Sequence, residues 1–272
     1  RPFEGWYSYL HSLPLSIIMG SIRTIAVLFS SVGSGMGDVG KFCIAQGITN
    51  PSLRLKPVAL SVPATEGPDE ILTVDVKYQE GHDRAAAGIA ALPRLPRVDI
   101  TAENAQAAIE AEIEGCDAVV ACLGSRQPSK KTRWLGIGST KVVAAMKAKG
   151  VNRLVNLSSM GIGDDYLPSN GWKKFWWCFL RVVIPSALKD LNKMEEVVTN
   201  SGLDYLQVRA MGLTPECPPR GVGSLTVLDK NIGESLDMMS SKEDMAAYML
   251  QEAAQPTRSR VAVTVGYLLG KK

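Results

Sequence analysis

Histidine is nearly absent from this sequence of 272 residues. The two histidines, His11 and His82, lie far apart along the chain, which argues against a histidine-based zinc site, and we expect no metal site. The five cysteines are scattered and form no C-x-x-C pair. Cys122 stands in an apolar run, which indicates buried free thiols and therefore a reducing compartment.

The chain also lacks a large net charge of either sign. The net charge of +3, without long blocks of one sign, argues against a nucleic-acid partner. The apolar stretch 13–29 is interrupted by Arg23 and stays short of the roughly 20 uncharged residues that span a membrane. We interpret residues 1–22 as a lead-in to a single domain, 23–272. Because the chain begins at Arg1, we expect a processed form or a fragment, soluble in the cytoplasm or inside an organelle after presequence removal.

From residue 98 onward, the sequence alternates regularly between apolar runs and helical patterns. Strands are expected at 98–100, 117–124, 151–159, 203–209 and 260–266. Helices are expected between them, at 101–115 with Thr101 as N-cap, at 139–150 with Ser139 as N-cap, at 189–202 and at 241–254. This order predicts an α/β fold with a Rossmann-like, doubly wound parallel sheet.

The first part of the chain is less regular. The apolar run 24–29 leads into the glycine-rich stretch 30–40, which is either a dinucleotide-binding turn or a flexible linker. The second strand is either 57–62 or 71–76. We prefer the latter, which makes 48–70 an irregular insertion after the first helix and places Lys77 at the strand's end.

A series of short motifs appears in a recognisable order. Leu-Gly-Ser-Arg ends the strand at 123–126, Ala-Met-Lys lies in the next helix, Ser158 and Ser159 end the following strand, and Ser-Gly-Leu-Asp-Tyr precedes Val208 and Arg209. This series resembles the atypical short-chain dehydrogenase/reductases that include NmrA-like proteins and biliverdin-IXβ (flavin) reductase. The resemblance implies a nicotinamide cofactor, NADP or NAD.

The resemblance also implies the site. The family's G-A-T-G-x-x-G turn, laid directly after the first strand, falls on Ser30 to Met36, so that Met36 takes the place of the third glycine. Lys77 stands where relatives bind the 2′-phosphate of NADP, and Asp99 stands beside the adenine unless it is a helix cap. Arg126 is either a phosphate ligand or a solvated surface charge. The predicted cofactor contacts are Gly33, Ser34, Gly35, Met36, Lys77, Asp99, Ile100, Leu123, Gly124, Ser125, Arg126 and Ser158.

The catalytic prediction concerns Ser159, which matches a serine that faces the nicotinamide in relatives, and which is otherwise a strand-end serine bonded to backbone. Directly after the strand that ends in Ser158 and Ser159, classical members have a Tyr-x-x-x-Lys pair, whereas here Tyr166 is followed four residues later by Asn170. This pattern favours a reductase of flavin- or tetrapyrrole-like conjugated acceptors. The alternative is a non-catalytic accessory or assembly subunit of a larger organellar membrane complex, with the tryptophan-rich segment 171–185 as a lid or as a surface for a protein or membrane.

Overall fold

In the computed structural model, the described residues are 22–30, 35–61, 74–124, 134–163, 182–229 and 236–270. The strands are β1 (Arg23–Ser30), β2 (Leu53–Ser61), β3 (Arg97–Asp99), β4 (Ala118–Cys122), β5 (Arg153–Ser159), β6 (Asp204–Ala210), β7 (Gly212–Leu213), β8 (Leu225–Leu228), β9 (Met239–Ser240) and β10 (Val261–Tyr267). The helices are α3 (Gly35–Ile48), α4 (Gln79–Ala90), α5 (Ala105–Ile113), α6 (Trp134–Lys149), α8 (Pro185–Thr199), α9 (Lys242–Ala254) and the 3₁₀ helix η2 (Val222–Ser224).

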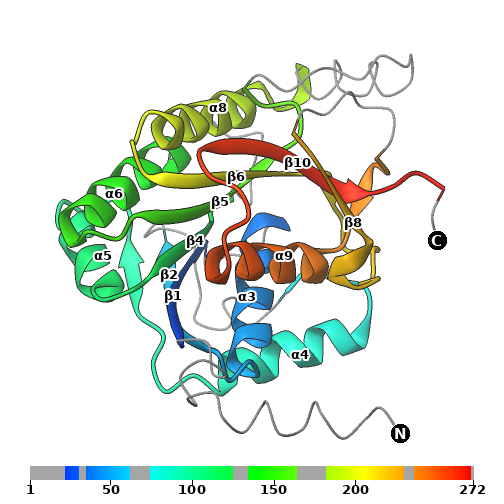
Figure 1. Cartoon of the computed structure of the whole chain (residues 1–272), viewed down its shortest axis with the longest axis horizontal. Helices are drawn as coiled ribbons and strands as arrows, with labels where there is room; N and C mark the ends of the chain where they lie inside the picture. The colour runs from blue at the N-terminus through cyan, green and yellow to red at the C-terminus, as the bar shows by residue number, and fades with distance from the viewer. Residues whose placement is uncertain are drawn as a thin grey trace, which may run out of the picture.

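Eight strands form one sheet in the order β3-β2-β1-β4-β5-β6-β10-β8, and β7 pairs with β9 in a small second sheet (Figure 1). All neighbours in the large sheet are parallel except β8, which runs antiparallel to β10. The strand order reverses between β1 and β4, where a doubly wound sheet places its ligand site. The predicted fold class is confirmed.

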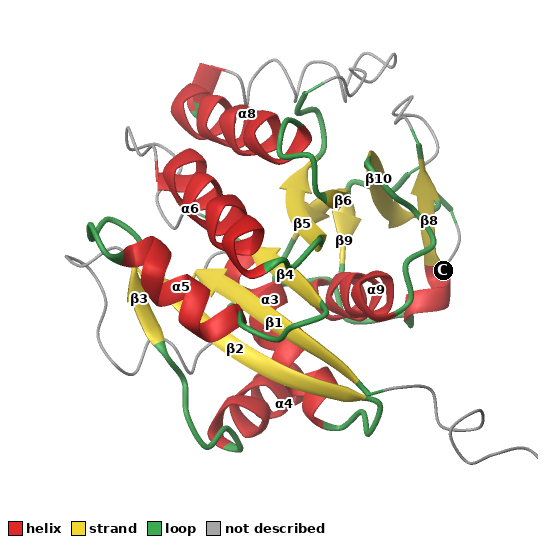
Figure 2. Cartoon of the chain, turned by 60° about the vertical axis from the view of Figure 1, so that its left-hand side comes forward, coloured by secondary structure: helices red, strands yellow, loops and turns green. Residues whose placement is uncertain are grey.

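Helices cover both faces of the sheet. Helices α3, α4 and α9 pack on one face and α5, α6 and α8 on the other, as Figure 2 shows. A hydrophobic cluster lies on each side, and all five residues of β4 are buried between them. A strand buried on both faces is apolar at every position, and the sequence of β4 has this pattern. Within the described ranges, no helix combines the length and apolar character that crossing a bilayer requires.

The predicted second strand is wrong. The structure places β2 at Leu53–Ser61, within the stretch predicted to be an irregular insertion, and it pairs along its whole first eight residues with β1. Pro57 made this stretch look irregular. It is tolerated because β3 pairs with β2 only from Ala59 onward. Val74 and Val76 of the preferred alternative are buried without belonging to a strand, and residues 71–73 lie outside the described part.

The two predicted N-cap residues, Thr101 and Ser139, are also wrong. Helix α5 begins at Ala105, because the backbone and hydroxyl of Thr101 donate to the Asp99 carboxylate instead. Helix α6 begins at Trp134, and Ser139 is buried within it. Helix α9 is capped by Ser241, whose hydroxyl accepts from the second and third backbone N–H groups of the helix.

Gly40 determines how closely α3 approaches the sheet. A Cβ on this residue would overlap the Cβ of Phe29 on β1 and lie 3.2 Å from the Cβ of Cys122 on β4. Both neighbours are Cβ atoms, which cannot move without the backbone. Only glycine therefore allows the observed contact between α3 and the two central strands.

We expect Gly40→Ala to lower the free energy of unfolding by about 1–3 kcal/mol, the usual cost of overpacking a core. Gly223→Ala is the control, because a Cβ at Gly223 would meet no atom within 4 Å. Urea unfolding of both variants measures the difference. Equal stability of the two variants would show that α3 can shift away from β1 at no cost.

Candidate functional site at the carboxyl edge of the sheet

The glycine turn connects β1 to α3 at the strand-order reversal. Gly33 and Ser34 lie outside the described residues, whereas Gly35 and Met36 begin α3. Met36 is partly buried and packs against both hydrophobic clusters. It is therefore an ordinary packing residue at the edge of the core.

The register of the turn stays a prediction, because residues 31–34 lie outside the described residues. Gly40, and not Met36, provides a close approach of helix and strand such as the third glycine of a Rossmann turn provides. Gly35, Gly37 and Gly40 have the G-x-G-x-x-G spacing, and all three lie within α3.

The end of β4 lies beside the end of β1. Leu123 and Gly124 are buried, and the Gly124 N–H donates to the Ser30 hydroxyl over 3.1 Å. This bond joins the two strands on either side of the order reversal. Ser125 and Arg126, the predicted phosphate contacts, lie outside the described residues.

At the end of β3, the two predicted cofactor residues have structural roles. The Asp99 carboxylate accepts from the Thr101 N–H at 2.8 Å and the Thr101 hydroxyl at 2.7 Å. Desolvation raises the pKa of this carboxyl, but these hydrogen bonds outweigh it and bring the pKa below its ordinary value. The Ile100 side chain is fully buried against Gly138 of α6, so it is a core residue and offers no surface to a ligand.

Lys77 does not stand at the end of the second strand, because that strand ends at Ser61. Its ammonium lies 2.6 Å from the Glu216 carboxylate, and both side chains are exposed. The hydrogen bond to Glu216 raises the pKa of Lys77. The reason for assigning Lys77 to the 2′-phosphate is therefore lost.

The two serines at the end of β5 face opposite sides of the sheet, because side chains alternate along a strand. Ser158 is buried and its hydroxyl donates to Glu195 of α8 at 2.6 Å. Ser159 is partly exposed on the face of α3 and α9, and its hydroxyl bonds to no other described residue. Of the pair, Ser159 has the side chain that can meet a ligand, whereas the Ser158 hydroxyl is buried against Glu195, and the assignment of Ser158 to the cofactor stays a prediction.

Ser158 belongs to a buried ionic cluster. Arg209 of β6 binds Glu195 with two parallel hydrogen bonds of 3.0 and 2.7 Å, and both side chains are 5% exposed. Gly163, with φ of +64°, closes over them, and a Cβ there would approach both charged groups. The cluster ties α8 to β6 and to the loop after β5, and thereby holds the backbone on which Ser159 lies.

The described residues at this edge fit a dinucleotide. A pyrophosphate binds backbone N–H groups at the start of a helix that lies close to its strand, and Gly40 allows that approach for α3. The glycines of the turn and the backbone around Gly124 would hold it. By contrast, the first N–H groups of α6 are occupied, because Leu135 and Gly136 both donate to the buried carboxylate of Asp190 at 3.0 Å.

Fold and edge together define a Rossmann-type nucleotide-binding protein. The chain belongs to the NAD(P)H-binding family, whose model matches residues 82–256. It thus combines a Rossmann-like sheet with membership of the NAD(P)H-binding family.

Solved structures agree with this fold. A Rossmann-fold NAD(P)-binding protein from Shigella flexneri has a TM-score of 0.57 at 18% identity, over 92% of this chain and 96% of that one. A short-chain dehydrogenase/reductase from Veillonella parvula in complex with NADP has a TM-score of 0.60 at 15% identity, over 90% and 94%. ChuY, an anaerobillin reductase from Escherichia coli O157:H7, has a TM-score of 0.55 at 15% identity, over 92% and 99%.

We expect Glu195→Gln to lower the free energy of unfolding by about 3 kcal/mol, because it leaves the buried guanidinium of Arg209 without its counter-charge. The neighbouring substitution Glu196→Gln is the control. Glu196 pairs with Lys193 on the surface, where both are more than half exposed, and such pairs contribute about 0–1 kcal/mol. Similar losses for both variants in urea unfolding would refute a special role for the buried cluster.

Lys77→Ala is expected to leave the ratio of the NADPH and NADH dissociation constants unchanged. The Lys77 side chain pairs with Glu216, and the residue does not lie at the end of β2. Isothermal titration of both nucleotides measures the ratio. A selective loss of NADPH affinity would restore Lys77 as the 2′-phosphate ligand.

Proposed function

We propose that this protein is an NAD(P)H-dependent reductase of a flavin- or tetrapyrrole-like conjugated acceptor. The observation that carries the proposal is the hydroxyl of Ser159. It is the partly exposed polar group at the end of β5, beside the strand-order reversal, and its backbone is held by the buried cluster of Glu195 and Arg209.

The bound cofactor supplies a hydride. The chain supplies a turn that binds its pyrophosphate and a hydroxyl that orients the ring. Reduction of a conjugated ring needs little proton transfer from the protein, since the negative charge spreads over the ring. This chemistry agrees with the sequence after β5, where Tyr166 is followed four residues later by Asn170 and not by the lysine of a Tyr-x-x-x-Lys pair. The name of ChuY, an anaerobillin reductase, supports an acceptor of the tetrapyrrole class.

The remaining cofactor contacts are part of the proposal. Gly35 and the backbone of Gly124 are assigned to the pyrophosphate, together with Ser125 and Arg126, which lie outside the described residues. NADP is proposed over NAD, because β2 ends at Ser61 and not at an acidic residue, which would repel a 2′-phosphate.

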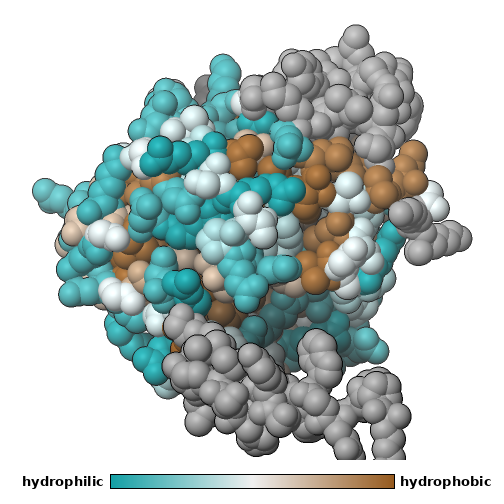
Figure 3. All heavy atoms as spheres, viewed as in Figure 1, coloured by the Kyte–Doolittle hydropathy of each residue, from teal (hydrophilic) through white to brown (hydrophobic). Residues whose placement is uncertain are grey.

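A second candidate, an accessory or assembly subunit, is favoured by exposed apolar side chains. Val182 is 80% exposed directly after the tryptophan-rich stretch 171–181, which lies outside the described residues. Leu269, two residues after β10, is 58% exposed. Figure 3 shows apolar atoms gathered in the region where Figure 1 labels β10. Such side chains suit contact with a protein or a membrane surface.

The proposed function predicts binding and hydride transfer. At 100 times its dissociation constant, NADPH should stabilise the protein by about 2.7 kcal/mol, measured by thermal unfolding. Loss of NADPH absorbance with FMN or biliverdin as acceptor then reports the reaction. Binding without oxidation of NADPH by either acceptor would favour the accessory role, and no stabilisation by NADPH or NADH would refute the proposed reductase.

Ser159→Ala is expected to lower kcat about tenfold, the scale of one lost hydrogen bond, and to leave the NADPH dissociation constant nearly unchanged. The control is Ser52→Ala, an exposed serine in the turn before β2, at the opposite edge of the sheet. An unchanged kcat in the Ser159 variant would refute its role at the ring.

A further inference from the structure

Three charged side chains are buried together where α3 and α9 begin. Asp38 and Lys41 belong to α3, Lys242 is the first residue of α9, and none of them is more than 1% exposed. The Lys242 ammonium lies 2.8 Å from Asp38 Oδ2, and the Lys41 ammonium lies 3.7 Å from Asp38 Oδ1. Desolvation makes such an ion pair a poor source of stability, and a well-packed apolar contact would serve the core at least as well.

The pair also holds a third segment of the chain. The backbone N–H of Asp75 donates to Asp38 Oδ2 over 3.1 Å, and Lys242 donates to the backbone carbonyl of Asp75. Val74 and Val76 on either side of Asp75 are buried in the core cluster beneath α3. One ion pair thus joins the start of α3, the start of α9 and the segment that returns after β2.

The position of the pair relates it to the nucleotide. Asp38 directly follows Gly37 of the glycine motif, in the first turn of the helix that receives the pyrophosphate. A carboxylate without counter-charge in this turn would repel an anionic ligand. Lys41 and Lys242 both lie beside this carboxylate, so its charge is compensated.

We propose that Asp38 and Lys242 are positioning residues for the dinucleotide. Their ion pair holds the start of α3 against the segment Val74–Val76, so that the helix start that receives the pyrophosphate is already in place when the ligand arrives. The inference rests on the nucleotide binding proposed above.

The test compares two ion pairs that involve adjacent residues of α9. The variant Asp38→Asn/Lys242→Met removes both partners of the proposed clamp, and Lys41 loses its contact with the Asp38 carboxylate in the same step. The control Arg84→Met/Glu243→Gln removes the pair between α4 and α9, whose two hydrogen bonds measure 2.9 and 2.8 Å. With both variants shown to be folded by circular dichroism, we expect the NADPH dissociation constant to rise about tenfold or more in the first and to stay within about twofold in the control.

Unchanged affinity in the Asp38/Lys242 variant would overturn the clamp while leaving the proposed function intact. Equal weakening in both variants would also overturn it, because the effect would then be a general loosening of α9. Failure of the unaltered protein to bind NADPH would refute both the clamp and the proposed function.

If the Asp38/Lys242 variant does not fold, hydrogen exchange of the unaltered protein tests the proposed clamp instead. The clamp predicts that NADPH slows amide exchange both at the start of α3 and at residues 74–78. Slower exchange at α3 alone would contradict it.

Discussion

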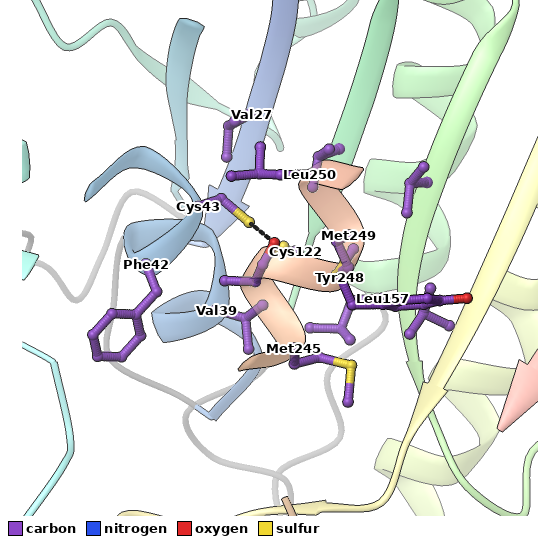
Figure 4. Close-up of a cluster of buried hydrophobic side chains, with 14 of the residues drawn as sticks. Val27, Val39, Phe42, Cys43, Cys122, Leu157, Met245, Tyr248, Met249 and Leu250 are labelled. Carbon is purple, nitrogen blue, oxygen red and sulfur yellow. Dashed lines mark hydrogen bonds between the residues drawn. The ribbon is translucent and has the colours of Figure 1, made fainter. Parts of the chain in front are cut away.

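The closeness of α3 to the central strands is the constraint on which the rest of the structure depends. Gly40 touches β1 and β4 at once, because a side chain there would collide with Phe29 and crowd Cys122. This contact brings Cys43 against α9, where its thiol donates to the carbonyl of Ala246 over 3.6 Å (Figure 4). Burial raises the pKa of the Cys122 thiol beside it well above its ordinary value, so that it packs as a small neutral side chain. Moving α3 outward would therefore disturb α9 as well.

At the carboxyl edge, the two faces of the sheet carry different polar side chains. On the face of α8, Ser158, Glu195 and Arg209 form a closed polar cluster that fixes the loop after β5. On the face of α3 and α9, the Ser159 hydroxyl and the glycine turn remain for a ligand. The side-chain alternation of one strand is enough to separate the buried Ser158 from the partly exposed Ser159.

Secondary structure was predictable where it depended on the neighbouring residues. Strand β4 is apolar at every position because both of its faces are buried, and Gly150 ends α6 with a φ of +67°. The start of α6 was not predictable, since its first N–H groups bond to Asp190, more than 50 residues later in the chain. Strand β2 was missed because Pro57 breaks its pattern, and only the position of β3 shows why the proline is tolerated.

The sequence by itself determined the alternation of strands and helices, the doubly wound sheet and the resemblance to NAD(P)H-binding reductases, because these follow from local periodicity and from motifs in order along the chain. Only the tertiary structure decided which glycine packs against β1, that Ser158 is bound to Glu195, and that Lys77 is paired with Glu216. The physical reason is the same in each case. The role of a side chain at this edge depends on a partner that comes from another strand, helix or loop, and the distance to that partner is not recorded in any local pattern.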